Sequence, residues 1–311
     1  MRQAFIDTCA ELISRDPNIY LLTADLGFMA FEDLQKRFPK NFVNIGVAEA
    51  NMVGVASGLA KCGKRVIIYS MIPFVTMRCL EQIRVCLCMT RANVVIVGVG
   101  AGYCYGSQGP SHHCIEDIGI MTALPNMSVF SPADAWEVEK GLKSLMRREG
   151  PSYVRLGKSG EPLLHRRTDK FVFGQWSCMR KGKDIAIFAT GEILATCLNV
   201  ARKLEREGIS ATVFSAHALK PTDASAIKTV SLQTGYVFTV EKNSPWGGLG
   251  SIVAHVLARE QIPLKGFYSF ALADAFHNTA GESKYLEEKD GLGEEAMLAI
   301  IRRIFKKGNR K

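Results

Sequence analysis

The sequence lacks several features that would assign it to a specialised class of protein. No apolar run approaches the roughly 20 residues that span a bilayer, so a transmembrane protein is not expected. Its nine cysteines form no CxxC pair and no regular spacing, which argues against a disulfide framework or a zinc site. The first residues carry Asp7 and Glu11 among apolar residues, a pattern typical of an amphipathic helix rather than a signal peptide. We therefore expect a protein of the reducing cytoplasm.

The composition indicates a globular chain with an excess of positive charge. With 311 residues and 47% hydrophobic side chains, the sequence predicts about two domains. The net charge of +9 lies partly in Arg147-Arg148, in His165-Arg166-Arg167 and in the tail at 306–311. No recognition motif for nucleic acid accompanies these basic residues, so nucleic acid is not an expected partner. An acidic partner protein or a phosphorylated substrate would respond to the same field.

Short β-rich runs alternate with helical patterns along the chain, which predicts parallel sheets with helices on both faces. The alternation pauses over a basic stretch containing glycine and proline, and then restarts. The predicted fold is therefore α/β, with two doubly wound, mostly parallel-sheet domains at 1–160 and 183–311, joined by a linker at 161–182. The expected strands are 19–25, 42–45, 65–71, 93–97, 128–131, 152–156, 184–189, 210–215, 236–241 and 265–271. The main expected helices are 49–61, 76–90, 134–148, 192–207, 222–231, 249–260 and 294–305.

Three motifs resemble known sites but do not meet their requirements. The segment Gly58–Arg65 approaches a P-loop, yet Arg65 stands where Ser or Thr would hold magnesium, and the segment ends a helix. The glycines of Gly98–Gly106 do not have the GxGxxG spacing, although the loop follows a predicted parallel strand, where ligands bind. The segment His112–Asp117 has five potential metal ligands, but adjacent histidines point apart and no second cluster completes the set. We expect no metal site in this chain.

The segment Asn44–Ala60 is the strongest candidate for chemistry. It contains a strand end, a glycine turn and a helix of small apolar residues in which Glu49 is the only carboxylate. Burial of a lone carboxylate is costly unless the group has a partner or a task. A first-turn glutamate is also favoured by the helix dipole, so the residues alone leave both interpretations open.

This segment resembles the GxAEQ stretch of the thiamine-diphosphate enzymes of the transketolase family. Further segments agree with that family in order and spacing, and together they cover nearly the whole chain. They are Thr23–Leu26, Gly109–His112, Ile115–Asp117, Leu124–Met127, Gly150–Arg155, Lys183–Gly191, His217–Pro221, Glu241–Ser244 and Gly247–Gly250. The resemblance implies a pyrimidine-binding domain followed by a transketolase C-terminal domain.

One motif of that family is absent. The family binds the diphosphate through magnesium on an N-terminal domain with GDG followed by Asn, and GDG occurs nowhere in this sequence. The chain therefore resembles the C-terminal half of a split transketolase. The resemblance implies that a separate N-terminal subunit completes the sites for thiamine diphosphate and Mg²⁺, and that a second copy of this chain joins a heterotetramer.

The resemblance also implies roles for individual residues. Glu49 would hydrogen-bond the aminopyrimidine ring and help remove the thiazolium proton, and Asp25 and Leu26 would lie near the cofactor. Either Ile72 or Phe74 would cover the pyrimidine ring. The implied substrate-binding residues are Gln108, His112, His113 and Arg155, of which His112 would also act in catalysis and Arg155 would bind a substrate phosphate.

Three departures from the family pattern fall among the residues expected around the substrate. Gln108 replaces an acid that contacts a sugar hydroxyl in the family, and Gly100 replaces a histidine that contacts the acceptor phosphate there. The segment Gly27-Phe28-Met29 replaces a serine-rich stretch. These changes predict a pocket that is less specific for sugar phosphates than the pocket of ordinary transketolases.

The leading functional hypothesis is ketol transfer from a ketose to an aldehyde, in carbohydrate metabolism. The alternative within thiamine chemistry is the β subunit of a 2-oxoacid dehydrogenase, which has a similar length and also needs a partner. A cofactor-free interaction protein is a third possibility, which the retained Glu49, Asp25 and His112 argue against.

Overall fold

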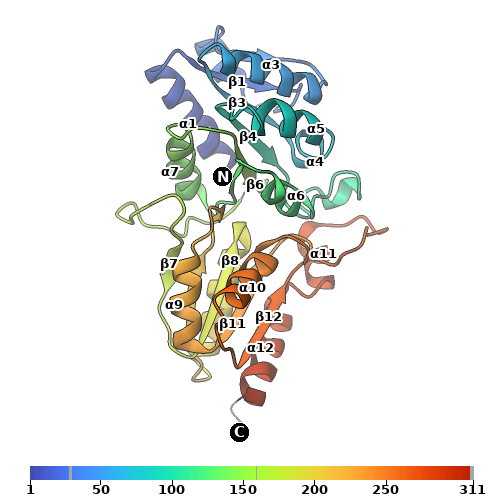
Figure 1. Cartoon of the computed structure of the whole chain (residues 1–311). Coiled ribbons are helices and arrows are strands. Elements are labelled where there is room, and N and C mark those ends of the chain that lie inside the picture. Colours follow the sequence, from blue (N-terminus) through green and yellow to red (C-terminus); the bar gives the residue numbers. More distant parts are fainter. Residues whose placement is uncertain (28–29, 159, 309–311) are drawn as a thin grey trace.

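A computed structural model describes residues 1–27, 30–158 and 160–308. Two lobes, each built around a β-sheet, are stacked one on the other (Figure 1). The blue-to-green lobe contains the first half of the chain, and the yellow-to-red lobe contains the second half. None of the helices in the described part of the chain has the length and apolar character needed to cross a membrane.

The first sheet has seven strands in the order β10-β5-β6-β4-β3-β1-β2. All its pairs are parallel except β10 with β5. Central strands of such a sheet are covered on both faces and are accordingly apolar throughout. The strands are β1 (Ile19–Thr23), β2 (Phe42–Asn44), β3 (Arg65–Met71), β4 (Val94–Val99), β5 (Ser128–Phe130), β6 (Ser152–Leu156) and β10 (Ala218–Lys220).

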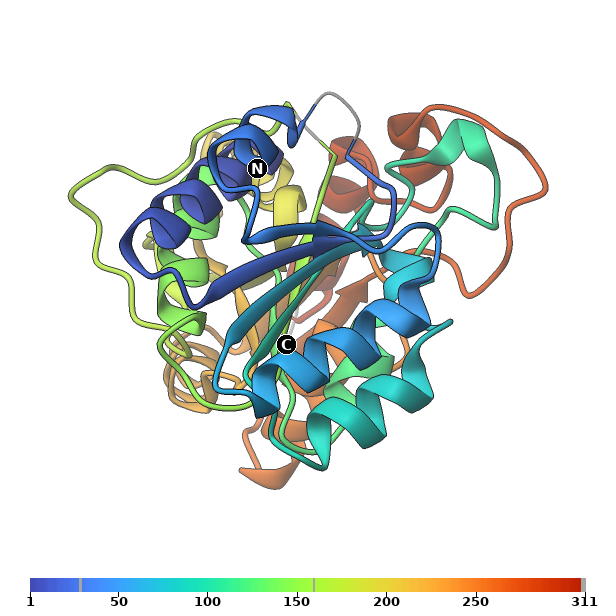
Figure 2. The same ribbon diagram turned by 90° about the horizontal axis from the view of Figure 1, so that it is seen from above.

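Helices cover both faces of this sheet (Figure 2). On one face lie α1 (Arg2–Arg15) and α7 (Ala135–Leu145), which pack against each other. On the other lie α3 (Glu49–Lys61), α4 (Ile72–Val75), α5 (Leu80–Gln82) and a π-helical segment, Ile83–Cys88. The prediction of one continuous helix over 76–90 is therefore wrong, since the chain turns between Val75 and Leu80.

The second sheet has five strands in the order β12-β11-β8-β9-β7, and only β7 runs antiparallel among them. Side chains alternate along β8, so Ile185 and Ile187 face a core with α8 and α12, while Ala186 and Phe188 face a core with α9 and α10. The strands are β7 (Ser177–Arg180), β8 (Ile185–Thr190), β9 (Ala211–Ser215), β11 (Tyr236–Glu241) and β12 (Gly266–Phe270). The helices are α8 (Leu194–Glu205), α9 (Ala224–Thr234), α10 (Leu249–Arg259) and α12 (Glu294–Gly308).

Two strands pair with sheets to which the sequence pattern did not assign them. Strand β7 lies within the predicted linker, 161–182, but pairs with β9, so the last part of that segment belongs to the second sheet. Strand β10 lies in the second half of the chain but pairs with β5 of the first sheet. A single apolar cluster also extends from β3 and β4 to α9 and α10. The predicted fold class is confirmed, with the two sheets more closely connected than expected.

The remaining described helices are short and lie in the connections. They are α2 (Glu32–Arg37), α6 (Asp117–Ala123), α11 (Ser283–Lys289) and the 3₁₀ turns Gly106–Gln108 and Gly191–Ile193.

Candidate active site

The topology of the first sheet predicts a ligand-binding site at the carboxyl ends of its strands. From β1 the chain goes outward to β2 and then crosses back to β3 on the other side of β1. Ligands of open α/β sheets bind outside the carboxyl ends of the strands at such a reversal. The segments that follow β1, β2 and β3 at this edge carry Asp25, Glu49 and Phe74.

Glu49 is buried at this edge. Gly46, with φ +76°, turns the chain into α3, and Glu49 is the first residue of that helix with 2% of its surface exposed. Ser70 Oγ lies 3.2 Å from Glu49 Oε1 and Arg78 Nη1 lies 3.0 Å from Oε2, so both donate to the carboxylate. A buried acid held by a hydroxyl, a guanidinium and a helix N-terminus is positioned, in contrast to an ordinary first-turn glutamate on a surface.

Phe74 connects this acid to His112. The Arg78 guanidinium lies 4.5 Å from the centre of the Phe74 ring, and the rings of Phe74 and His112 meet edge to face at 5.5 Å. Arg78 has 51% of its side chain exposed and Phe74 is half-buried, so this face is accessible. Ile72 is fully buried in the main apolar core. Of the two residues predicted to cover a cofactor ring, Ile72 has no exposed surface, whereas Phe74 has an accessible aromatic surface.

Asp25 and Leu26 follow β1 at the same edge. Asp25 has φ +53°, a left-handed conformation that Asp tolerates better than most residues. Asn44 holds it: Asp25 N donates to Asn44 Oδ1 at 3.0 Å, and Asn44 Nδ2 donates to Asp25 Oδ1 at 2.9 Å. Asp25 is exposed and Leu26 is half-buried. Phe28 and Met29, in the departure from the family pattern, lie outside the described residues.

The loop after β4 carries three of the predicted substrate residues. Gln108 is exposed on the 3₁₀ turn, and the half-buried His112 has Nδ1 3.0 Å from Ser111 Oγ. His113 is only 7% exposed, and its Nε2 lies 3.3 Å from the carbonyl oxygen of Gly106. Burial lowers the pKa of His113, so the ring is a neutral core group under the loop. With so little exposed surface, the contact of His113 with a substrate stays a prediction.

Arg155 is also buried. It is 1% exposed, and its Nε lies 2.8 Å from Asp117 Oδ2. Its Nη2 donates to the carbonyl oxygens of Cys114 at 3.2 Å and Lys242 at 2.8 Å. A buried guanidinium with these partners links the two lobes, and the contact with a substrate phosphate stays a prediction.

Lys158 is a further cation at this edge, which the motifs in the sequence did not single out. It lies two residues after β6, is exposed, and places its ammonium 5.4 Å from the centre of the Tyr105 ring. It lines a cavity of about 340 Å³ between the lobes, together with Cys104, Glu192 and Lys242. The sequence does contain a signal for Lys158, because a lysine just beyond a predicted parallel strand lies at the ligand-binding edge of the sheet.

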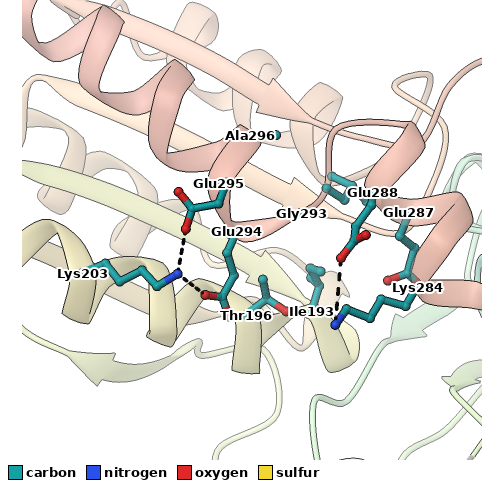
Figure 3. Close-up of a pocket in the computed structure, with 11 residues that line it drawn as sticks. Ile193, Thr196, Lys203, Lys284, Glu287, Glu288, Gly293, Glu294, Glu295 and Ala296 are labelled. Atoms are coloured by element: carbon teal, nitrogen blue, oxygen red, sulfur yellow. Dashed lines mark hydrogen bonds and ion pairs between the residues drawn. The ribbon is translucent and has the colours of Figure 1, made fainter.

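A larger cavity, of about 800 Å³, lies between α8, α11 and α12 in the second lobe. Its charged side chains pair with one another, as Figure 3 shows for Lys203 with Glu294 and Glu295 and for Lys284 with Glu288. Since its charges are already compensated and no catalytic candidate lines it, we do not assign the chemistry to this cavity.

The residues at the sheet edge fit the aminopyrimidine half of thiamine diphosphate, because they offer a buried carboxylate beside an accessible aromatic ring. They do not form a metal site. In the described ranges, no group of three or more His, Cys, Asp or Glu side chains could hold a metal ion, His112–Asp117 included.

Comparison with known proteins matches two domain families to the chain. A family model described as "Transketolase, pyrimidine binding domain" matches residues 1–161, and one described as "Transketolase, C-terminal domain" matches residues 174–289. The chain is 36% identical over 266 residues to a subunit of the apulose-4-phosphate transketolase of Phocaeicola vulgatus, covering 85% of each chain. It is 32% identical over 311 residues to the 6-deoxy-6-sulfo-D-fructose transketolase subunit SqwH of Clostridium sp., covering 99% of this chain and 95% of that one.

A solved structure is also closely similar. It is titled "Split gene transketolase, inactive beta4 tetramer", has a TM-score of 0.90 and 37% sequence identity, and the match covers 98% of both chains.

Proposed function

The chain belongs to the transketolase family, and we propose that it is the C-terminal subunit of a two-chain, thiamine-diphosphate-dependent transketolase. The assembled enzyme transfers a two-carbon ketol unit from a ketose donor to an aldehyde acceptor. The observation that carries this proposal is the buried Glu49 at the reversal point of the first sheet, beside the accessible ring of Phe74.

Glu49 shares a proton with the aminopyrimidine. Its two oxygens are already held by Ser70 and Arg78, so the carboxyl has a defined orientation toward a ligand at the edge. Thiamine diphosphate, when bound, supplies the electron sink that lets a bond next to a carbonyl break. Phe74 offers a ring face to the pyrimidine, and Asp25 and Leu26 border the same space.

His112 and Gln108 are the proposed substrate contacts from the loop after β4. His112 packs against Phe74 and therefore lies next to the cofactor site, where a ring nitrogen reaches a carbonyl or hydroxyl. Lys158 is a further proposed contact for a substrate anion, in addition to the one predicted for Arg155. The substrates named for the two relatives carry a phosphate or a sulfonate, and an exposed lysine at this edge suits either anion.

The diphosphate and Mg²⁺ require a partner chain, which we propose to be an N-terminal subunit with the GDG motif. A second copy of this chain joins through α3 and the π-helical segment. Gly54 and Gly58 of α3 face open space, and Val47, Val85 and Met89 are exposed nearby in the sequence. The tetramer of β chains in the similar structure is titled inactive, which agrees with the need for the other subunit.

The domain division is part of the same proposal: a pyrimidine-binding domain at 1–160, a linker from 161 that ends before β7, and a C-terminal domain to residue 311. We also propose a cytoplasmic location, which the nine unpaired cysteines support. The relatives reported above are transketolase subunits, and they do not favour a 2-oxoacid dehydrogenase β subunit.

Co-expression tests this function. The chain is purified with and without an N-terminal subunit, and each preparation is assayed for ketol transfer with a panel of ketose donors and aldehyde acceptors. We expect activity only for the pair, with added thiamine diphosphate and Mg²⁺. Decarboxylation of a 2-oxoacid by the pair, without ketol transfer, would contradict the proposal.

A further inference from the structure

The segment between β6 and β7 forms one wall of a second pocket, away from the carboxyl edge of the first sheet. This segment, 164–176, which we call the strap, is the yellow-green loop at the side of the molecule in Figure 1. Together with β7 and α8 it encloses about 660 Å³. Small-molecule sites typically occupy about 300–1,000 Å³, so the volume suits a small ligand.

Carboxylates hold both ends of the strap, the buried Asp134 at one end and the half-buried Asp223 at the other. At one end, the backbone N–H groups of Leu164 and His165 donate to Asp134 Oδ2 at 2.8 and 2.9 Å. The His165 ring also stacks on Trp136 at 4.7 Å. At the other end, Trp176 N donates to Asp223 Oδ2 at 2.9 Å. The wall of the pocket is therefore fixed at both ends by hydrogen bonds rather than formed by a free loop.

Among the charged side chains that line this pocket, cations predominate. Arg166 and Lys170 come from the strap, Arg180 from β7 and Arg202 from α8. Neither the Arg166 guanidinium nor the Lys170 ammonium has an ion pair within the described ranges. Asp169, the carboxylate that lines the pocket, already accepts the backbone N–H of Arg166 at 2.8 Å.

Arg180 adds an unsatisfied donor. One side of its guanidinium pairs with Glu205, but its Nε is buried and has no hydrogen-bond partner. Arg202 Nη1 donates to Asn199 Oδ1 at 2.8 Å, a neutral partner that leaves its charge uncompensated. A guanidinium with free N–H groups suits the oxygens of a phosphate, with which it forms charge-assisted hydrogen bonds.

We propose that this pocket binds a small phosphate ester, at a site distinct from the ketol-transfer site. The Arg166 side chain belongs to the basic triplet His165-Arg166-Arg167, which the transketolase function leaves unexplained. A single-stranded nucleic acid is a poorer fit, because the tryptophan of the pocket, Trp176, is 5% exposed and has no free face for base stacking.

Calorimetric titration of the full-length chain tests the site, with glucose 6-phosphate as the probe and glucose and inorganic phosphate as comparisons. The triple variant R166Q/K170Q/R202Q removes three pocket cations, and R303Q removes one exposed arginine of α12 as the matched control. We expect the dissociation constant for glucose 6-phosphate to rise about tenfold or more in the triple variant and to stay within about twofold in R303Q.

Lys158→Gln separates this site from the substrate site, since it removes the proposed substrate cation and should leave binding at the strap unchanged. If the triple variant does not fold, Lys170→Gln alone is titrated in its place. Lys170 is exposed on the strap, so this substitution should leave the fold intact. Equal affinities of the triple variant and R303Q would overturn the proposal. So would equal binding of glucose and glucose 6-phosphate, or loss of binding in Lys158→Gln alone.

Discussion

Arg78 donates to Glu49 across 3.0 Å while half of its own side chain remains exposed. The buried acid is therefore connected to the accessible face of the first lobe by a single guanidinium, which also lies over one face of the Phe74 ring. This relationship places an ionisable group, a cation and an aromatic ring at one point of the sheet edge, and the predictions about catalysis depend on it.

Glu49→Gln should remove ketol transfer while the fold and the assembly with the partner subunit persist. The amide is nearly isosteric with the acid but cannot share a proton with the pyrimidine, so we expect a loss of about 10²–10⁴-fold in kcat. Steady-state kinetics of the assembled enzyme measures this loss. Glu81→Gln, at an exposed carboxylate of α5, is the control and should leave kcat unchanged. Activity of Glu49→Gln within about threefold of the unaltered enzyme would show that Glu49 is structural.

The isolated chain should bind thiamine diphosphate weakly. It holds the proposed pyrimidine contacts, but in the described ranges it has no metal-binding group for the diphosphate. Charge-assisted contacts supply much of the affinity for such a group. Calorimetry with Mg²⁺ and thiamine diphosphate, with and without the N-terminal subunit, measures the difference. Micromolar or tighter binding by the chain alone would contradict the split site.

Lys158→Gln should raise KM for a phosphorylated acceptor and leave kcat nearly unchanged. Loss of one exposed charge contact is worth up to about tenfold in affinity. The matched acceptor without the phosphate should show no change in KM, which separates an anion contact from a general disturbance. Lys183→Gln, at another exposed lysine, is the control. Equal changes for both acceptors would exclude the proposed role.

Arg155→Met should destabilise the chain. The variant leaves Asp117 buried without its cation, and breaking a buried pair in this way costs about 3–5 kcal/mol. Urea unfolding measures the loss, and Arg206→Met, at an exposed arginine, should change stability by less than about 0.5 kcal/mol. An unaltered stability with a raised KM for a phosphorylated substrate would support the role predicted from the sequence.

The contribution of Glu241 to the free energy of unfolding should fall as the pH rises from about 4.5 to 7. Burial raises the pKa of Glu241 from 4.5 to about 7, although Leu249 N and Gly250 N donate to its carboxylate. The folded state therefore keeps a proton that the unfolded chain releases, so this contribution to stability is fully present below pH 4.5 and is lost toward pH 7. The loss is up to about 3 kcal/mol.

Urea unfolding across this pH range measures the effect. Glu241→Gln cannot titrate and should show a flatter curve, while Glu149→Gln, at an exposed carboxylate, should follow the unaltered chain. The buried Glu137, whose pKa burial also raises to about 7, contributes a decline of the same sign that remains in both variants. Parallel curves for all three proteins would contradict the role of Glu241.

Much of the architecture could be read from local patterns. The strands 65–71 and 236–241 are runs of apolar and β-branched residues, and the structure gives them the same bounds. Glu49 was found because a lone carboxylate in an apolar helix is conspicuous in any sequence. The break at 76–79 was missed, because the hydrophobic spacing there fits a continuous helix and the turn depends on how the segment packs under α3.

The sequence by itself determined the alternation of strands and helices, the family and the identity of the central acid. Only the tertiary structure decided which neighbouring side chains face the site. Arg155 and Lys158 lie three positions apart, yet one is buried against Asp117 and the other is exposed. The adjacent His112 and His113 also differ, since His112 is half-buried and His113 is buried. The physical reason is that burial and hydrogen-bond partners come from distant segments, here Asp117 and the carbonyl oxygen of Lys242, and local patterns in the sequence do not carry that information.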